Sequence, residues 1–268
     1  MKTLLITGAT DGLGLATARQ LAGAGHHLIV HGRDPYKVAA LADELAAHTR
    51  VETCVADFSD LQAVRSMATT LSASYPQIDA LINNAGVYKA PQTDKHTIDI
   101  RFRVNTIAPY ILTRALMNNL SGGRVINLCS AAQTPVNLAA LHGLQQCHSP
   151  MDAYAQSKLA LTTWTMAMAM ANTATQKSQP ADIQFIAINP GSLLATKMVQ
   201  QGFGISGNDT GPAVTLLVSA AVGTVFATAN GSYFDNDIGE FGRAHPEAYQ
   251  PKQQQQLLEL LELMAASS

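Results

Sequence analysis

Short apolar runs alternate along the chain with longer segments in which apolar side chains recur at helical spacing. This alternation is typical of repeated strand–helix–strand units, and it predicts a doubly wound parallel α/β sheet with helices on both faces. The expected strands lie at residues 3–6, 27–31, 51–55, 80–83, 124–129, 183–189 and 232–234. The expected helices lie at residues 12–24, 35–48, 60–75, 98–117, 153–171 and 212–222, with a C-terminal helix following the glutamine run 253–256.

No segment divides the chain. A linker rich in Pro, Gly or Ser is absent, as is a repeat with a period on the order of 20 to 50 residues, so residues 1–268 are expected to form one domain. One long loop, at residues 131–151, interrupts the rhythm of strands and helices. A loop of this length inside a compact domain is more often functional than idle, so it is interpreted as a substrate loop.

The composition is that of a compact globular protein. Of the 268 residues, 47% are hydrophobic and 13% are charged, and 17 Lys and Arg against 19 Asp and Glu give a net charge of −2. This balance argues against intrinsic disorder and against nucleic-acid binding, which usually needs a basic surface. Polar residues interrupt the weakly polar stretch 213–229, so we expect no membrane span, and the short apolar start does not predict a signal peptide.

The three cysteines, Cys54, Cys129 and Cys147, form no C-x-x-C pair. This usage predicts free thiols in a reducing compartment, and we expect a cytoplasmic protein. His142 and His148 lie in the loop 131–151 without further ligands at suitable spacing, so no metal site is predicted.

A glycine-rich turn joins the first expected strand to the first expected helix. Glycines let the backbone turn sharply and approach a pyrophosphate, and free N–H groups at the start of a helix supply a partial positive charge. The turn therefore predicts a binding site for an anionic dinucleotide. Asp11 is unfavourable there, because a basic residue at this place would strengthen phosphate binding. The candidate contacts are Gly8, Thr10, Asp11, Gly12, Leu13 and Gly14.

The second expected strand ends with His31-Gly32-Arg33-Asp34. A carboxylate at this place accepts hydrogen bonds from the ribose 2′-hydroxyl of NAD, whereas a guanidinium can bind the 2′-phosphate of NADP. Arg33 therefore favours NADP(H) over NAD(H). The NAD alternative stays open through Asp34 if the strand ends one residue later.

Tyr154 and Lys158 lie four residues apart in an expected helix, on one helical face. A tyrosine has a pKa of about 10 and is a poor acid or base near neutrality. A neighbouring ammonium, together with an oxidised nicotinamide, should lower the pKa of Tyr154 toward the working range. The pair is consistent with a proton-transfer site, although the same spacing also occurs by coincidence on exposed helices.

Further motifs surround this pair in a fixed order. Residues 81–86 end the fourth strand with Leu-Ile-Asn-Asn-Ala-Gly, residues 124–130 end the fifth strand at a serine, and residues 189–191, Asn-Pro-Gly, follow the sixth. Together with the glycine turn, this order resembles the short-chain dehydrogenase/reductase family from the first strand to about Phe234. The resemblance implies a Rossmann-type sheet of about seven strands in the order 3-2-1-4-5-6-7. The interval of 24 residues between Ser130 and Tyr154 resembles the branch of retinol dehydrogenases and protochlorophyllide reductases.

The resemblance also implies a catalytic tetrad of Asn105, Ser130, Tyr154 and Lys158. In this family the residue matching Tyr154 donates or accepts the proton at the substrate oxygen, and the residue matching Ser130 hydrogen-bonds the same oxygen. Lys158 would also bind the nicotinamide ribose, and Asn105 would hold a water that links Lys158 to solvent. Pro109, four residues after Asn105, is expected to kink the helix.

Further cofactor contacts follow from the resemblance. The residue matching Asp57 meets the adenine amino group, and Tyr154 and Lys158 also belong to the cofactor site. Thr196 lies one residue later than the usual family spacing, so its contact stays open. Thr7 and Asn83 are expected to bridge strands rather than to bind the cofactor. The remaining implied contacts are Phe58, Asn84, Ala85, Gly86, Pro190 and Gly191.

These motifs predict an NADP(H)-dependent oxidoreductase that interconverts a carbonyl and an alcohol, in which the cofactor moves hydride and Tyr154 moves the proton. Apolar residues in the loop 131–151 favour a bulky or lipophilic aldehyde or ketone, unless that loop is a surface excursion. By the resemblance, residues 192–211 form a second substrate loop, and its glycine-rich part, residues 202–211, falls where the family carries a mobile lid. Because the helix that carries Tyr154 often forms the subunit contact in this family, a homodimer or homotetramer is expected.

Two alternatives stay open. An epimerase or dehydratase that retains its nucleotide fits less well, because of the glycine spacing in the turn and the short substrate region. A non-catalytic NADP(H)-binding redox sensor or scaffold would bind the nucleotide without transferring hydride.

Overall fold

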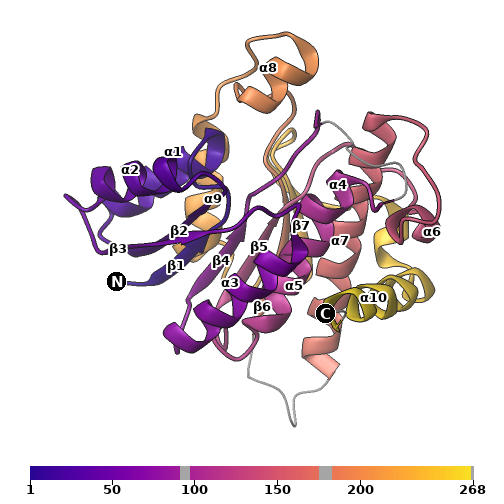
Figure 1. Ribbon diagram of the computed structural model, residues 1–268, viewed down its shortest axis with the longest axis horizontal. Helices are drawn as coiled ribbons and strands as arrows, with labels where there is room; N and C mark the ends of the chain where they lie inside the picture. Colours follow the sequence, from indigo (N-terminus) through magenta and orange to yellow (C-terminus); the bar gives the residue numbers. More distant parts are fainter. Residues whose placement is uncertain (91–96, 175–182, 267–268) are drawn as a thin grey trace.

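The computed structural model describes residues 1–90, 97–174 and 183–266 (Figure 1). These residues form an eight-stranded sheet in the order β3-β2-β1-β4-β5-β6-β7-β8, parallel except for the last pair. The strands are β1 (Thr3–Ile6), β2 (His27–Gly32), β3 (Val51–Val55), β4 (Ala80–Asn83), β5 (Arg124–Leu128), β6 (Gln184–Asn189), β7 (Ser232–Asp235) and β8 (Glu240–Gly242). The helices are α1 (Gly12–Gly23), α2 (Pro35–Leu45), α3 (Leu61–Ser74), α4 (Ile100–Phe102), α5 (Ala108–Ala115), α6 (Leu138–Leu141), α7 (Pro150–Ala174), α8 (Lys197–Phe203), α9 (Gly211–Val222) and α10 (Pro251–Ala266), with a π-helix η1 (Arg103–Ile107) and a 3₁₀-helix η2 (Pro246–Tyr249).

The doubly wound sheet and the predicted order of its first seven strands are confirmed. The eighth strand, β8, was not predicted. It has only three residues, two of them exposed, and it turns back from β7 through Gly239 at φ +74° to pair antiparallel with β7. So short a strand leaves no apolar alternation to detect.

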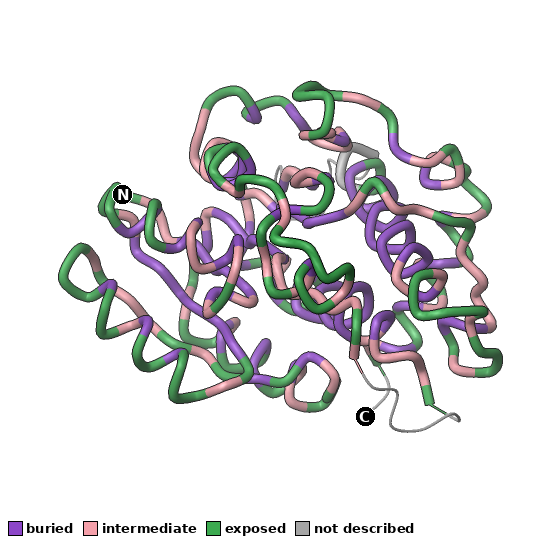
Figure 2. The backbone as a smooth tube through the Cα atoms, turned by 90° about the horizontal axis from the view of Figure 1, so that it is seen from above, coloured by how far each residue is buried: buried purple, intermediate pink, exposed green. Residues whose placement is uncertain are grey.

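The central strands β1, β4, β5 and β6 are largely apolar and buried because both faces of the sheet are covered there. Leu5 and Leu81 pack on the face that carries α3, α5, α7 and α10. Their neighbours Leu4 and Ile82 point to the opposite face, which carries α1, α2 and α9. Figure 2 shows buried residues concentrated in the interior strands and helices, with exposed residues along the outer loops.

The expected helix 98–117 is divided into α4, η1 and α5. Pro109 has no N–H to donate to the carbonyl of Asn105 four residues earlier, so the regular ladder cannot pass this point. The chain widens instead into the π-helix, in which the N–H of Ala108 bonds the carbonyl of Arg103. The expected distortion at Asn105 is therefore confirmed, and such π-helical turns are frequent at functional sites.

The C-terminal helix α10 lies against α7 and α5 (Figure 1). Leu257 and Leu261 are buried there, and Glu262 accepts a hydrogen bond from Tyr110 at 2.7 Å and pairs with Arg114 at 2.7 Å. Helix α10 therefore covers part of the α7 surface that a subunit contact was expected to use.

Candidate active site

The glycine turn between β1 and α1 is tightly packed. Gly8 and Gly12 have φ of +63° and +51°, in the left-handed region that favours glycine. A Cβ on Gly14 would lie 2.3 Å from the carbonyl oxygen of Gly8 and 2.5 Å from Nδ2 of Asn84, so only glycine lets α1 approach the turn this closely. Thr10 lies against Gly32 at the end of β2, and Leu13 is buried in the core.

His31 supports this turn from behind, a role that the sequence did not reveal. Its Nδ1 accepts the N–H of Gly8 at 3.2 Å, so Nε2 carries the proton and donates to the carbonyl of Ala56 at 3.0 Å. The ring stacks on Phe58 with centroids 4.4 Å apart, and burial lowers the pKa of His31 to about 4. A neutral histidine therefore ties the turn to the end of β3. Phe58 contributes a buried ring behind the site.

A lysine from the expected substrate loop 192–211 neutralises Asp11. The Asp11 carboxylate accepts the N–H of Gly12 at 2.9 Å and caps α1, and its other oxygen lies 2.5 Å from Nζ of Lys197. Thr196 caps α8 and lies beside the turn, 3.4 Å from the position of a Cβ on Gly12. The structure thus places Thr196 at the glycine turn and adds Lys197, which sequence reasoning missed although it follows Thr196 directly.

Arg33 and Asp34 at the end of β2 differ in their surroundings. One oxygen of Asp34 accepts the backbone N–H groups of Tyr36 and Lys37 at 3.0 and 3.3 Å, so this carboxylate caps α2. Arg33 is exposed and forms no ion pair within the described ranges. Asp57 is also exposed and accepts the N–H and hydroxyl of Ser59, both at 2.8 Å.

The segment after β4 joins the turn to the candidate tetrad. The hydroxyl of Thr7 accepts the N–H groups of Asn84 and Ala85, both at 3.0 Å, and Nδ2 of Asn84 donates to the carbonyl of Thr7 at 2.8 Å. Asn83 donates to Asn127 at 2.8 Å, so it bridges β4 and β5 as expected. A Cβ on Gly86 would lie 3.4 Å from Oδ1 of Asn105 and 3.6 Å from Nζ of Lys158. Gly86 thus leaves open space beside both side chains.

Ser130, Tyr154 and Lys158 meet where β5 ends against α7. The Ser130 side chain lies close enough to the Tyr154 hydroxyl to favour its ionised form. Nζ of Lys158 lies 5.8 Å from the centroid of the Tyr154 ring and donates to the carbonyl of Leu128 at 2.6 Å. Tyr233 supports Ser130 by donating to its carbonyl at 3.3 Å.

Burial dominates the electrostatics of Tyr154 and Lys158. Removal from water raises the pKa of Tyr154, and the nearby Ser130 side chain offsets only part of that rise. Burial lowers the pKa of Lys158 to about 8. Lys158 by itself does not produce the expected lowering of the Tyr154 pKa, because its ammonium is directed to the Leu128 carbonyl. The lowering by Lys158 together with an oxidised nicotinamide stays a prediction.

Asn105 holds the tetrad together from the π-helix. Its Nδ2 donates to the carbonyl of Val87 at 3.0 Å and to Oγ of Ser157 at 2.9 Å, while its Oδ1 accepts the N–H of Val87 at 2.8 Å. Ser157 in turn donates to the carbonyl of Tyr154 at 2.7 Å. Asn105 is buried and joins the segment after β4 to α7. The bridging role of Ser157 had no separate signal in the sequence.

Pro190 and Gly191 lie at the base of the lid. Gly191 has φ +117°, and its N–H donates to Asn189 at 3.2 Å. Asn236 donates to the carbonyl of Pro190 at 2.8 Å, and Asp237 accepts the N–H of Ser192 at 2.7 Å. These bonds fix the start of the loop 192–211 to the end of β7.

The apolar side chains of the loop 131–151 largely serve the core. Leu141 is fully buried, and Val136, Leu138 and Cys147 pack against the core cluster, whereas Leu144 is 76% exposed. The backbone N–H of Val136 donates to Glu247 at 2.9 Å. Most of the side chains expected to line a substrate pocket are therefore used for internal packing.

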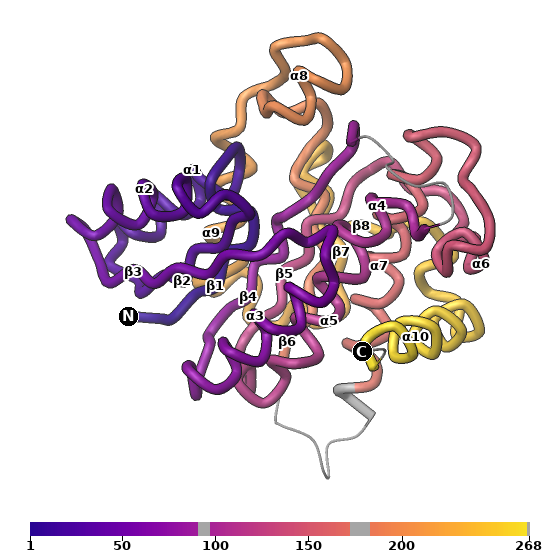
Figure 3. Tube along the Cα trace, in the orientation of Figure 1, coloured from indigo at the N-terminus to yellow at the C-terminus, as the bar shows by residue number. Residues whose placement is uncertain are grey.

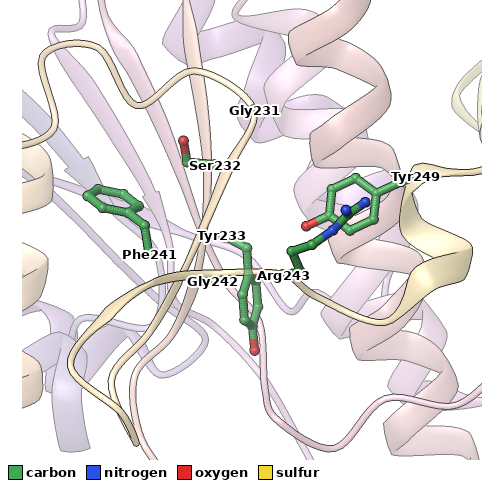
Figure 4. A pocket seen from close by; sticks show the side chains of 7 residues that line it. All are labelled: Gly231, Ser232, Tyr233, Phe241, Gly242, Arg243 and Tyr249. Carbon is green, nitrogen blue, oxygen red and sulfur yellow. The ribbon is translucent and has the colours of Figure 1, made fainter.

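Two surface cavities lie on and beside the β7–β8 hairpin and contain no residue of the tetrad. One, of about 350 Å³, is shown in Figure 4, where Arg243 lies across the ring of Tyr249. The other, of about 510 Å³, lies between α9 and β7. Within the described ranges, no cluster of three His, Cys, Asp or Glu residues could hold a metal, and no helix is long and apolar enough to cross a membrane.

Comparison with known proteins identifies the family. The family model for short chain dehydrogenase matches residues 2–203. The chain belongs to this family.

The curated relatives of this chain include enzymes whose names give different substrates. Retinol dehydrogenase 13 of Homo sapiens is 29% identical over 257 residues, which cover 87% of this chain and 76% of the relative. Sulfoacetaldehyde reductase 2 of Chromohalobacter salexigens is 37% identical over 137 residues, which cover 48% of this chain and 54% of the relative. This short chain dehydrogenase is therefore an oxidoreductase, and its relatives do not agree on a substrate.

Solved structures share the fold. A crystal structure of an uncharacterized protein from Mycobacterium Paratuberculosis has a TM-score of 0.81 at 27% identity and covers 100% of this chain and 94% of its own. A short chain dehydrogenase from Burkholderia cenocepacia, solved in complex with NADP, has a TM-score of 0.69 at 26% identity and covers 89% and 97%. The residues of this short chain dehydrogenase fit a nicotinamide dinucleotide, because the glycine turn leads directly into the N-terminus of α1 and Gly86 leaves space before Lys158.

Proposed function

We propose that this enzyme is an NADP(H)-dependent oxidoreductase that interconverts an aldehyde or ketone and an alcohol. The observation that carries the proposal is the convergence of Tyr154 and Ser130 beside the buried ammonium of Lys158, whose Nζ lies 5.8 Å from the centroid of the Tyr154 ring. Two hydroxyl groups that converge in this way can both reach one carbonyl oxygen. The bound nicotinamide would supply or accept the hydride.

Each residue of the tetrad has a distinct task in this proposal. The Tyr154 hydroxyl delivers the proton to the carbonyl oxygen, and the Ser130 hydroxyl donates a hydrogen bond to that oxygen as negative charge develops. Lys158 binds the nicotinamide ribose and attracts the phenolate that Tyr154 becomes. Asn105 fixes the backbone at Val87. Through Ser157 it also fixes the part of α7 that carries Tyr154 and Lys158.

The preference for NADP(H) over NAD(H) rests on the end of β2. Asp34, the carboxylate that could take a ribose 2′-hydroxyl, is engaged as the cap of α2. Arg33 is exposed beside it and can form charge-assisted hydrogen bonds to a 2′-phosphate. The contacts proposed for the rest of the cofactor remain those of the glycine turn, Asp57, the segment 84–86, Pro190, Gly191 and Thr196.

The proposal is tested by titrating the protein with NADPH and NADH by fluorescence, and then following cofactor absorbance with a panel of aldehydes, ketones and quinones. We expect tighter binding of NADPH and carbonyl-dependent oxidation. Arg33→Ala should weaken NADPH binding about tenfold or more, since a hydrogen bond to a charged group contributes about 1.5–3 kcal/mol. Arg50→Ala, at another exposed arginine, is the control. Tight binding without turnover of any carbonyl would contradict the proposal.

We also propose one cytoplasmic domain. Because α10 packs against α7, two copies could pair through α7 only at the part of its surface that α10 leaves uncovered, or after α10 is displaced. Light scattering of the full chain tests the oligomeric state. The variant Leu261→Asp, which weakens the packing of α10, tests whether α10 limits it.

A further inference from the structure

Three aromatic rings stand in a row at the edge of the candidate active site. The ring of Tyr88 meets that of Tyr154 edge to face, with centroids 5.4 Å apart and an interplanar angle of 68°. It also stacks on Phe203, with centroids 5.3 Å apart and an angle of 14°. Tyr88 follows β4, whereas Phe203 is the last residue of α8. The lid helix therefore reaches the proposed proton donor through one aromatic side chain.

Gly202 lets α8 approach Tyr88 closely. A Cβ at this position would lie 2.8 Å from Cδ1 and 2.9 Å from Cε1 of Tyr88, closer than a side chain tolerates. The helix ends directly afterwards at Gly204, which has φ +70°. The backbone at Gly202 and the ring of Phe203 thus form one surface on Tyr88.

The loop that carries this surface is fastened at its base and stands clear of the other helices, above the sheet in Figure 3. Ala195 donates to the carbonyl of Asn208, and Asn208 donates to the carbonyl of Leu193, both at 2.7 Å. On this loop, Leu193 at the base is 42% exposed, and Phe203 and Ile205 beyond it are 48% and 42% exposed. Large apolar side chains exposed on a lid beside a catalytic group favour an apolar ligand.

We propose that Tyr88 and Phe203 bind the flat, apolar part of the substrate, so that the enzyme prefers aromatic aldehydes and ketones. The inference rests on the proposed carbonyl reduction. A carbonyl oxygen that reaches the Tyr154 hydroxyl brings the attached group next to Tyr88, because the two tyrosine rings are in contact. A planar ring can stack there and be covered by Phe203 as α8 moves, whereas a puckered ring of the same size cannot stack.

The test compares acetophenone with cyclohexyl methyl ketone, which share a carbon skeleton but differ in planarity. The readout is the ratio of the two kcat/KM values in each variant, because intrinsic reactivity then cancels between variants. Tyr88→Leu should lower this ratio at least fivefold, mainly through a higher KM for acetophenone. Tyr88→Phe, which keeps the ring, should preserve the ratio.

Phe203→Leu is the second variant. Because Phe203 is half-exposed, this substitution should leave the fold intact. It should lower the ratio about two- to fivefold, while Phe241→Leu, at a phenylalanine of β8 that is 44% exposed, should leave the ratio unchanged. NADPH titration of each variant verifies that the cofactor site is intact, and Phe203→Leu decides the matter if Tyr88→Leu does not bind NADPH.

The proposed aromatic site would be overturned if kcat/KM fell equally for both ketones, so that their ratio did not change in the variants that bind NADPH. Turnover of other carbonyls but of neither ketone by the unmodified enzyme would also overturn it and leave the proposed function standing. Turnover of no carbonyl at all would overturn both.

Discussion

The two halves of the candidate site differ in how they are held. The half formed by β4, β5, η1 and α7 is buried: Asn105, Ser157 and Lys158 are 1%, 0% and 5% exposed, and their hydrogen bonds connect three elements. The half formed by the loop 192–211 meets the rest of the site through an exposed ion pair and an aromatic stack. Proton-transfer geometry is thus fixed by the core, whereas the recognition surface can rearrange without disturbing it.

The largest expected effect comes from removing the proposed acid in the buried half. Tyr154→Phe should lower kcat by about a thousandfold, within the range of about 10²–10⁴ that a general acid supplies. NADPH binding and thermal stability should change little, since the ring remains. Steady-state kinetics and fluorescence titration measure the two properties. Activity near that of the unmodified enzyme would remove Tyr154 from proton transfer.

Glycines in the two regions provide a direct comparison of rigidity. Gly14→Ala places a methyl group 2.3 Å from a backbone oxygen and should destabilise the fold by about 3 kcal/mol, at the upper end for overpacking. The methyl group added by Gly202→Ala contacts only the Tyr88 ring, and α8 can move away from it. The free energy of unfolding should therefore change by less than about 0.5 kcal/mol, while the KM for an aromatic ketone rises.

Gly23→Ala is the control for this comparison, because a Cβ there has no neighbour within 4 Å in the same helix α1. It should be neutral or slightly stabilising. Urea denaturation measures all three variants, and equal destabilisation by Gly14→Ala and Gly202→Ala would show that the lid is as rigid as the turn.

The buried half also carries an electrostatic penalty that pH reveals. The pKa of Lys158 is lowered by burial to about 8 from an ordinary 10.5, so the folded protein binds fewer protons than the unfolded chain between these values, and stability rises with pH across this window. The penalty, roughly 3 kcal/mol at most, is fully present below pH 8 and is gone above about pH 10.5. Lys158→Met should therefore be inactive yet melt a few degrees higher at pH 7.

Thermal melts of Lys158→Met at pH 7 and pH 10 check this prediction, with the gain expected to shrink at the higher pH. Loss of the bond to the Leu128 carbonyl works against the gain, by about 1 kcal/mol. A variant less stable than the unmodified enzyme by the same amount at both values would show that the ammonium carries no burial penalty.

The same difference between regions explains what the sequence could predict. Local sequence patterns predict the strands from apolar runs and the turn from its glycines. They predict the pair Tyr154 and Lys158 from helical spacing. Other contacts join residues that are distant in the chain, namely those of His31, Tyr88 and Lys197. Lys197 and its partner Asp11, for example, are separated by 186 positions. No local periodicity encodes such pairs. Tyr88 meets Phe203, and Lys197 meets Asp11, only when the loop 192–211 folds back over the sheet, whereas His31 meets Gly8 and Ala56 when β2 pairs with β1 and β3.

The smallest expected effect concerns the ion pair that joins the lid to the cofactor turn. Lys197→Ala leaves the charge of Asp11 without its partner beside the proposed pyrophosphate site and should raise the NADPH dissociation constant about two- to fivefold at low salt. Because Lys197 and Asp11 are 62% and 47% exposed, salt should screen most of this effect.

Adding Asp11→Asn to Lys197→Ala should restore affinity, because the repelling charge is then gone, while Lys252→Ala on α10 should have no effect. Fluorescence titration at low and high salt measures the whole cycle. If Lys197→Ala weakens binding equally at both salt concentrations and Asp11→Asn does not restore it, Lys197 acts through the packing of α8 rather than through its charge. The lid would then be coupled to the cofactor turn by shape, and the recognition half would be less independent of the buried half than the exposed ion pair suggests.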